Sequence, residues 1–213
     1  MNSFSINEGL YLNVTPRGAY NATHDNQQDI SRNILIKLLQ QDETPEFSND
    51  IITTLFSDDS DENLGLLDKM QELGLITGQK TSESAPQDSL EEKLPELLSS
   101  LSGSGKALLA DKSGLYLGTS GFPHEAAEEL AAISANLSEV YQRHKGLLQG
   151  NLGFSQNAWG LVDAAGNAEV GFWPLYIGKN TFTLILHGLP QFNQPSFRHL
   201  VWMLVKRYGE NRE

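Results

Sequence analysis

Two short stretches of this sequence resemble known ion-binding or phosphate-binding loops. The first, SGSGKALL at residues 102–109, contains the Gly-Lys pair of a phosphate-binding P-loop. That loop also needs a glycine five residues before the glycine of the pair and a Ser or Thr after the lysine. This chain has Ser100 and Ala107 at those positions. The glycines therefore indicate the flexible exit of a helix, and the sequence predicts no P-loop.

The second stretch, DDSDENLG, alternates Asp59, Asp61 and Asn63 as the first ligands of an EF-hand calcium loop do. The glycine that should follow Asn63 is displaced to Gly65, and the twelfth position is Met70 in place of glutamate. Acidic residues are also favourable at the start of a helix. We therefore expect Ser60 or Asp61 to cap a helix, and we expect no metal site.

The loop GTSG at residues 118–121 lies between an apolar segment and an alanine-rich one. Amides at the start of a helix favour anions, so a phosphate site is physically conceivable there. Glu125, Glu128 and Glu129 follow at once and would repel a phosphate. The five histidines show no metal-pair spacing, and no Gly-x-Ser-x-Gly elbow is present. The sequence predicts no catalytic residues and no cofactor.

The composition bounds the class of protein. The chain has 213 residues, of which 39% are apolar, and no cysteine. Disulfides and thiolate chemistry are therefore excluded. No apolar run is long enough to cross a bilayer, and the first residues do not form a secretory signal. We expect a cytoplasmic protein without a membrane span.

The charge is unevenly distributed along the chain. Residues 1–80 carry 13 acidic and 5 basic side chains, whereas residues 94–213 carry 10 and 9. A polar, serine-containing stretch lies between these halves. The sequence therefore predicts an acidic domain at 1–77, a linker at 78–87 and a second domain at 88–213.

The N-terminal half shows the pattern of a strand, three helices and a second strand. Apolar residues alternate over 10–14 before Thr15-Pro16, and helical spacing follows after Asp25. The segment 46–56 fits a helix or a strand. The third helix, 60–74, is expected to bury Leu66, Leu67, Met70 and Leu73, and it leads into the strand LITG.

This order resembles the winged helix, whose third helix enters the DNA major groove. Phosphate contacts need lysine and arginine. The third helix offers Asp61, Glu62, Asp68 and Glu72 against Lys69. We therefore expect a degenerate winged helix that binds protein, and we regard nucleic acid as an unlikely partner.

The C-terminal half predicts the order helix, two strands, long helix, three strands, helix. Leucines form one stripe over residues 90–101, and the strands KALLAD and LYLGTS turn at Ser113-Gly114. The long helix runs from Pro123 to Lys145, with Gly146 as its stop. Strands NAWGLVDA, AEVGFWPLYI and TFTLILHG follow, and a helix at 195–208 ends the half.

Residues 88–209 resemble the roadblock/dynein light chain family, most clearly in the stretch LLADKSGLYLGTSGFPHEAAEELAAISANL. The resemblance implies an α+β fold, in which helices flank a five-stranded antiparallel sheet. It also implies a non-catalytic homodimer that acts through protein contacts, with a small Ras-like GTPase as a partner. A transcriptional regulator dimerised by this domain and a small-molecule sensor are the alternatives. A sensor would need a polar-lined cavity, and the crowded aromatic residues around Phe172 and Trp173 argue against one.

The long helix carries a stripe of large residues, Leu130 to Tyr141, beside a stripe of small ones. We expect the large residues to pack on the domain's own sheet and the small ones to admit a second helix. Roadblock domains pair through this helix and the third strand. The resemblance thus implies a dimer interface made of Ala127, Ala131, Ser134, Ser138, Trp159, Leu161 and Val162. Trp202 and Met203 form a possible partner surface, or they pack on the N-terminal domain.

Overall fold

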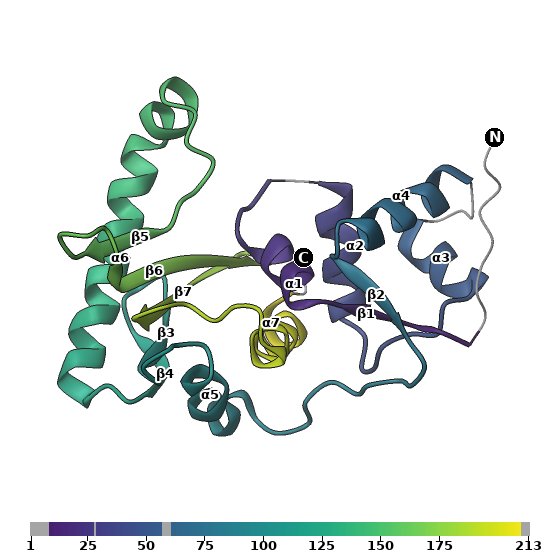
Figure 1. Cartoon of the computed structure of the whole chain (residues 1–213), viewed down its shortest axis with the longest axis horizontal. Coiled ribbons are helices and arrows are strands. Elements are labelled where there is room, and N and C mark those ends of the chain that lie inside the picture. Colours follow the sequence, from purple (N-terminus) through teal and green to yellow (C-terminus); the bar gives the residue numbers. More distant parts are fainter. Residues whose placement is uncertain (1–8, 28, 57–60, 210–213) are drawn as a thin grey trace.

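The computed structural model describes residues 9–27, 29–56 and 61–209. The fold is α+β, and Figure 1 shows the N-terminal half on the right and the C-terminal half on the left. The first half contains β1 (Tyr11–Val14), α1 (Pro16–Thr23), α2 (Ile30–Leu39), α3 (Asn49–Phe56), α4 (Asp61–Glu72) and β2 (Ile76–Gln79). The second contains α5 (Leu90–Ser99), β3 (Ala107–Asp111), β4 (Tyr116–Ser120), α6 (His124–Lys145), η1 (Gly146–Asn151), β5 (Trp159–Val162), β6 (Ala168–Ile177), β7 (Asn180–His187) and α7 (Pro195–Tyr208).

Helix α1 was not expected from the sequence. The Thr15 hydroxyl accepts a hydrogen bond from the Gly18 amide at 3.0 Å, and Pro16 occupies the first turn. Both are favourable at a helix start, since the cap satisfies a free amide and proline needs no partner there. Thr15-Pro16 therefore begins a helix, whereas the sequence predicts only that the first strand ends before this pair.

The other elements of the N-terminal half lie close to their expected places. The ambiguous segment is the helix α3, and β2 pairs antiparallel with β1. In α4, Leu67 and Met70 are buried as expected. Leu73 lies beyond the helix and is exposed, so its expected burial was wrong. The proposed cap residue Ser60 falls outside the described residues.

The predicted five-stranded antiparallel sheet is confirmed, with strand order β4-β3-β7-β6-β5. The loop GTSG ends β4 before α6 begins, as expected. Side chains alternate between the faces of a strand. Ala107 and Leu109 thus join a cluster with α5 and α7, while Leu108 and Ala110 face α6.

Helix α7 packs against both halves of the chain. One hydrophobic cluster contains residues from both sides of the predicted linker, and α7 contacts α1, α2 and α5. The division into domains at 77 and 88 stays a prediction. In this fold, the shared cluster means that the N-terminal half covers part of the same sheet face as α7.

A buried arginine ties α7 to the rest of this face. Arg198 donates hydrogen bonds to the side chains of Asn13 in β1 and Glu83 in the predicted linker. His199 Nε2 lies 2.8 Å from the same Glu83 oxygen. Partial burial alone would raise the pKa of the Glu83 carboxyl, but the hydrogen bonds from Arg198 and His199 outweigh it and lower that pKa.

Helix α6 ends at Lys145, as predicted, but Gly146 does not end the helical path. The path continues through the π-helical turn η1 before the chain returns to β5. Gly146 has helical dihedral angles, so it does not adopt the left-handed conformation that ends many helices. Figure 1 shows the end of α6 and η1 extending beyond the sheet.

Candidate functional site

Strand β5 forms one edge of the five-stranded sheet. It pairs with β6 on one side, and no described strand pairs with its other side. Leu161 and Val162 are 62% and 57% exposed on it. An open strand edge with exposed apolar side chains favours pairing with another chain. Trp159, at the start of β5, is half-buried against the sheet.

Further exposed apolar side chains lie on α6 and on the segment that follows it. Ile133 and Val140 are exposed on α6, as are Leu147 in η1 and Leu152 and Phe154 in the loop that follows. Where exposed apolar side chains form one patch, they commonly mark an interaction site. Together with Leu161 and Val162, these five residues define what we call the α6–β5 surface.

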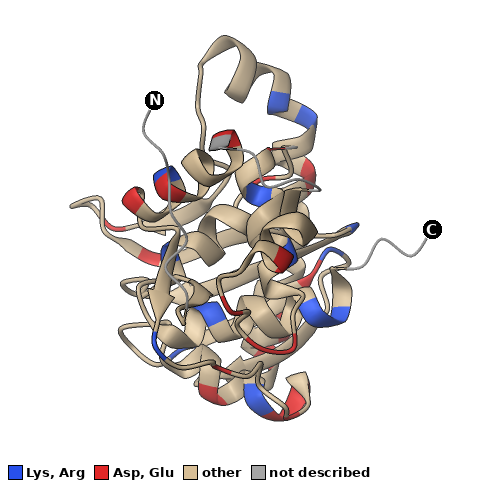
Figure 2. Ribbon diagram, turned by 90° about the vertical axis from the view of Figure 1, so that its right-hand side faces the viewer, with Lys and Arg blue, Asp and Glu red and all other residues tan. Residues whose placement is uncertain are grey.

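The charges of α6 are separated along its length. Glu125 lies in the first turn, with Glu128 and Glu129 close behind, while Arg143, His144 and Lys145 lie in the last turn. Figure 2 shows basic residues near the end of this helix, at the top of the view. Two such helices that run antiparallel would place the acidic start of one beside the basic end of the other.

The small-residue stripe of α6 faces inward, which corrects the sequence expectation. Ala127, Ala131 and Ser134 are buried within the chain, and Ser138 is half-buried. The side chains of these small residues are therefore not exposed to a second copy. The stripe of large residues is divided. Leu130, Leu137 and Tyr141 are half-buried or buried, as expected, whereas Ile133 and Val140 are exposed.

The burial of the small residues is explained by the sheet below the helix. Its facing surface carries the large side chains of Leu108, Phe172 and Ile185. Large side chains on one layer favour small ones on the other where the two layers approach most closely. The sequence of α6 alone does not contain this information.

Trp202 and Met203 are only 2% and 7% exposed. The Trp202 indole Nε1 donates a hydrogen bond to the carbonyl oxygen of Gln41 at 3.0 Å. The guanidinium of Arg198 lies 5.8 Å from the centre of the Trp202 ring. Of the two alternatives drawn from the sequence, packing within the chain is the one observed, and these side chains form no exposed partner surface.

A narrow crevice separates α6 from the sheet. Its volume is about 10 Å³, which is enough for one water molecule. Its lining is mostly apolar, and polar side chains, including those of Ser134, Asn157 and Thr183, contribute the rest. In this conformation the crevice is therefore too small for an organic ligand.

The P-loop-like fragment has a structural role in this fold. The Ser104 hydroxyl donates to the His187 carbonyl oxygen at 3.0 Å and lies 2.9 Å from Nδ1 of the same residue. Ser102 donates to that carbonyl at 2.6 Å. These contacts join the start of β3 to the end of β7. Sequence reasoning missed them, because residues about 85 positions apart show no common spacing.

Two negative findings apply to the described residues. They include no group of three or more His, Asp and Glu placed to hold a metal ion. Nor does any described helix combine the length and apolar character needed to cross a bilayer. The chain as a whole matches no protein-family model and no curated protein.

Proposed function

We propose that this protein is a non-catalytic homodimeric adaptor whose two copies join through the α6–β5 surface. The observation that carries the proposal is the open strand edge β5 with its exposed Leu161 and Val162, together with the exposed apolar side chains of α6 and η1. A second copy of the chain can satisfy the open edge and cover the exposed side chains. Its β5 can pair with the β5 edge of the first copy, and its apolar side chains can cover those of the first copy.

The charges of α6 favour a two-fold arrangement. An antiparallel helix pair centred on Asn136 places Glu129 of one copy opposite Arg143 of the other, since both residues are seven positions from the centre. Such a two-fold contact occurs twice by symmetry. In this arrangement, the two five-stranded sheets meet edge to edge at β5.

The resemblance of residues 88–209 to roadblock domains supports the same dimer, since that family pairs through the corresponding helix and strand. The strands and helices follow the order expected from the sequence. By the same resemblance, the dimer presents a composite surface to a protein regulator, and a small Ras-like GTPase is the partner class that we propose.

Cysteine cross-linking tests the dimer directly, because the natural chain has no cysteine. Single cysteines would replace each residue of β5 in turn, from Trp159 to Val162, and Leu189 as an exposed apolar control. Disulfides form only where two Cβ atoms come within about 4.5 Å. We expect at least one β5 variant to form disulfide-linked dimers much faster than Leu189→Cys. Equal rates for all variants would contradict pairing at β5.

The partner class needs its own experiment. The immobilised full-length protein would be incubated with lysate of its source in the presence of GTP or GDP, and retained proteins identified by mass spectrometry. We expect a Ras-like GTPase to be retained in one nucleotide state. Retention of DNA-associated proteins, or of no GTPase, would contradict the partner assignment and leave the dimer proposal standing.

A further inference from the structure

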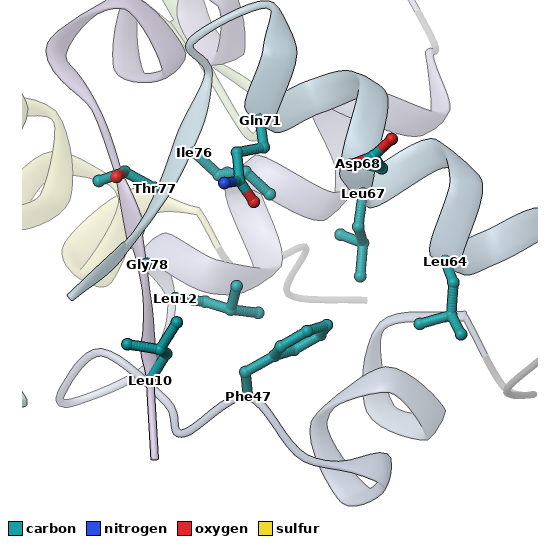
Figure 3. A pocket seen from close by; sticks show the side chains of 10 residues that line it. All are labelled: Leu10, Leu12, Phe47, Leu64, Leu67, Asp68, Gln71, Ile76, Thr77 and Gly78. Atoms are coloured by element: carbon teal, nitrogen blue, oxygen red, sulfur yellow. The ribbon is translucent and has the colours of Figure 1, made fainter. Parts of the chain in front are cut away.

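The N-terminal half contains a groove of about 300 Å³ between β2 and α4. This volume is at the lower end of the range for ligand pockets. In Figure 3, Leu64 and Leu67 of α4 point toward Leu12 and Phe47 across the groove. The remaining lining residues are Leu10, Asp68, Gln71, Ile76, Thr77 and Gly78.

One side of the groove is a strand. Three consecutive residues of β2, from Ile76 to Gly78, line it. Successive side chains of a strand point to opposite faces of the sheet. A groove on one face alone would not be lined by three consecutive residues, so this groove reaches the edge of β2. Gly78 has no side chain, which lets Leu10 pack close to the strand, since a Cβ at this position would lie 3.1 Å from the end of the Leu10 side chain.

The outer edge of β2 has free backbone groups. In an antiparallel pair, alternate residues point their amide and carbonyl groups away from the partner strand. On β1, Leu12 is such a residue, because its amide bonds to Pro45 instead of β2. Its register partner is Gly78, and Ile76 has the same orientation. Within the described residues, the backbone groups of Gly78, which is exposed, have no hydrogen-bond partner on that side. Ile76 is only 3% exposed, so its backbone is covered within the chain.

The segments that line the groove carry exposed acidic side chains. Asp68 lines it, Glu62 and Glu72 are exposed on the same helix, and Glu46 is exposed next to Phe47. None of these four carboxylates forms an ion pair within the described part of the chain. Lys69 is the single basic residue of α4. The charge therefore favours a basic ligand.

We propose that this groove binds an extended basic peptide segment of a partner protein, which adds to the edge of β2 as a strand and places one large apolar side chain between β2 and α4. Strand addition supplies backbone hydrogen bonds, and the pocket supplies side-chain selectivity. The site lies outside the α6–β5 surface, so it does not depend on the dimer proposal.

The test uses the full-length protein and three fluorescein-labelled ten-residue peptides. The first alternates lysine and valine around one central phenylalanine. The second has glutamate in place of every lysine, and the third has serine in place of every apolar residue. Fluorescence anisotropy would measure binding at low and high salt. We expect saturable binding of the first peptide alone, weakened by salt because exposed charges are screened.

Two matched pairs of variants locate the site. Gly78→Val places a side chain in the groove, and its Cβ would lie 3.1 Å from the movable end of Leu10. Gln79→Val is its control on the same strand. Asp68→Lys reverses a charge in the groove, and Glu72→Lys reverses one on the same helix outside it. We expect Gly78→Val to abolish binding and Asp68→Lys to weaken it about fivefold, as expected for about 1 kcal/mol. Gln79→Val should weaken binding less than Gly78→Val does, and Glu72→Lys should weaken it less than Asp68→Lys does.

Three outcomes would overturn the proposal. The first is equal binding of all three peptides. The second is that Gly78→Val binds the basic peptide as tightly as the wild type does, provided that both proteins have the same melting temperature. The third concerns residues 1–8, which precede Gly9 beside the groove. If their deletion were needed before the basic peptide could bind, the groove would be a site for the chain's own N-terminus. Sedimentation of the same variants would show that the dimer is unaffected in each case.

Discussion

The two faces of the five-stranded sheet differ in how completely the chain covers them. One face lies under α5, α7 and part of the N-terminal half, and its side chains belong to a large continuous cluster. The other lies under α6, where a small cluster is bordered by half-buried residues. Exposed apolar side chains accumulate on the second side, on α6, η1 and β5.

This difference separates residues that stabilise the chain from residues that are available to a partner. Trp202 and Met203 look like surface residues in the sequence, yet the N-terminal half helps to bury them. Leu161 and Val162 stay exposed, because no described element covers β5. We therefore expect substitutions on the α7 face to change folding stability and substitutions on the α6–β5 surface to change association.

The largest effect on stability is expected from Arg198→Ala on the α7 face. The substitution leaves Asn13 and Glu83 without their shared donor and should lower the free energy of unfolding by about 3 kcal/mol. Arg207→Ala is the control, since it removes an exposed ion pair with Glu91 and should cost less than about 1 kcal/mol. Urea denaturation would measure both. Equal losses of stability in the two variants would contradict the difference that we assign to the buried and exposed sides of α7.

A smaller loss is expected from Ala131→Leu under α6. Ala131 is buried against the sheet, whereas the next residue, Ala132, is exposed. Overpacking should cost about 2 kcal/mol for Ala131→Leu. Ala132→Leu should change the free energy of unfolding by less than about 0.5 kcal/mol. If Ala132→Leu proved the more destabilising of the two, the inward assignment of the small stripe would be wrong.

The smallest effect is expected from Glu83→Gln, and it should depend on pH. The folded-state pKa of Glu83 is lowered, so its stabilising contribution is fully present above the unfolded value of about 4.3 and is lost as pH falls through the lower folded value. The difference in melting temperature between wild type and variant should therefore shrink from pH 6 to pH 3. A difference that grows over this range would contradict the role given to Arg198 and His199.

The sequence predicted the elements of the C-terminal half well, because hairpin turns and helical spacing are local signals. The bounds of α7, for example, agree with the expected 195–208. It did not predict that the small stripe of α6 is also buried against the sheet, since that depends on Leu108, Phe172 and Ile185 in distant strands. The missed α1 had a readable signal in Thr15-Pro16. The β2–α4 groove combines residues from 10 to 78, and no local pattern indicates it.

Sedimentation velocity on the full-length protein tests the central claim most directly. The wild type would be compared with Leu161→Glu and Val140→Glu on the α6–β5 surface, and with Leu189→Glu at an exposed site elsewhere. We predict that the wild type and Leu189→Glu sediment with twice the 23.5 kDa mass of one chain, while the two surface variants sediment as monomers. A monomeric wild type at all concentrations, or dimers that persist in both surface variants, would contradict the claim.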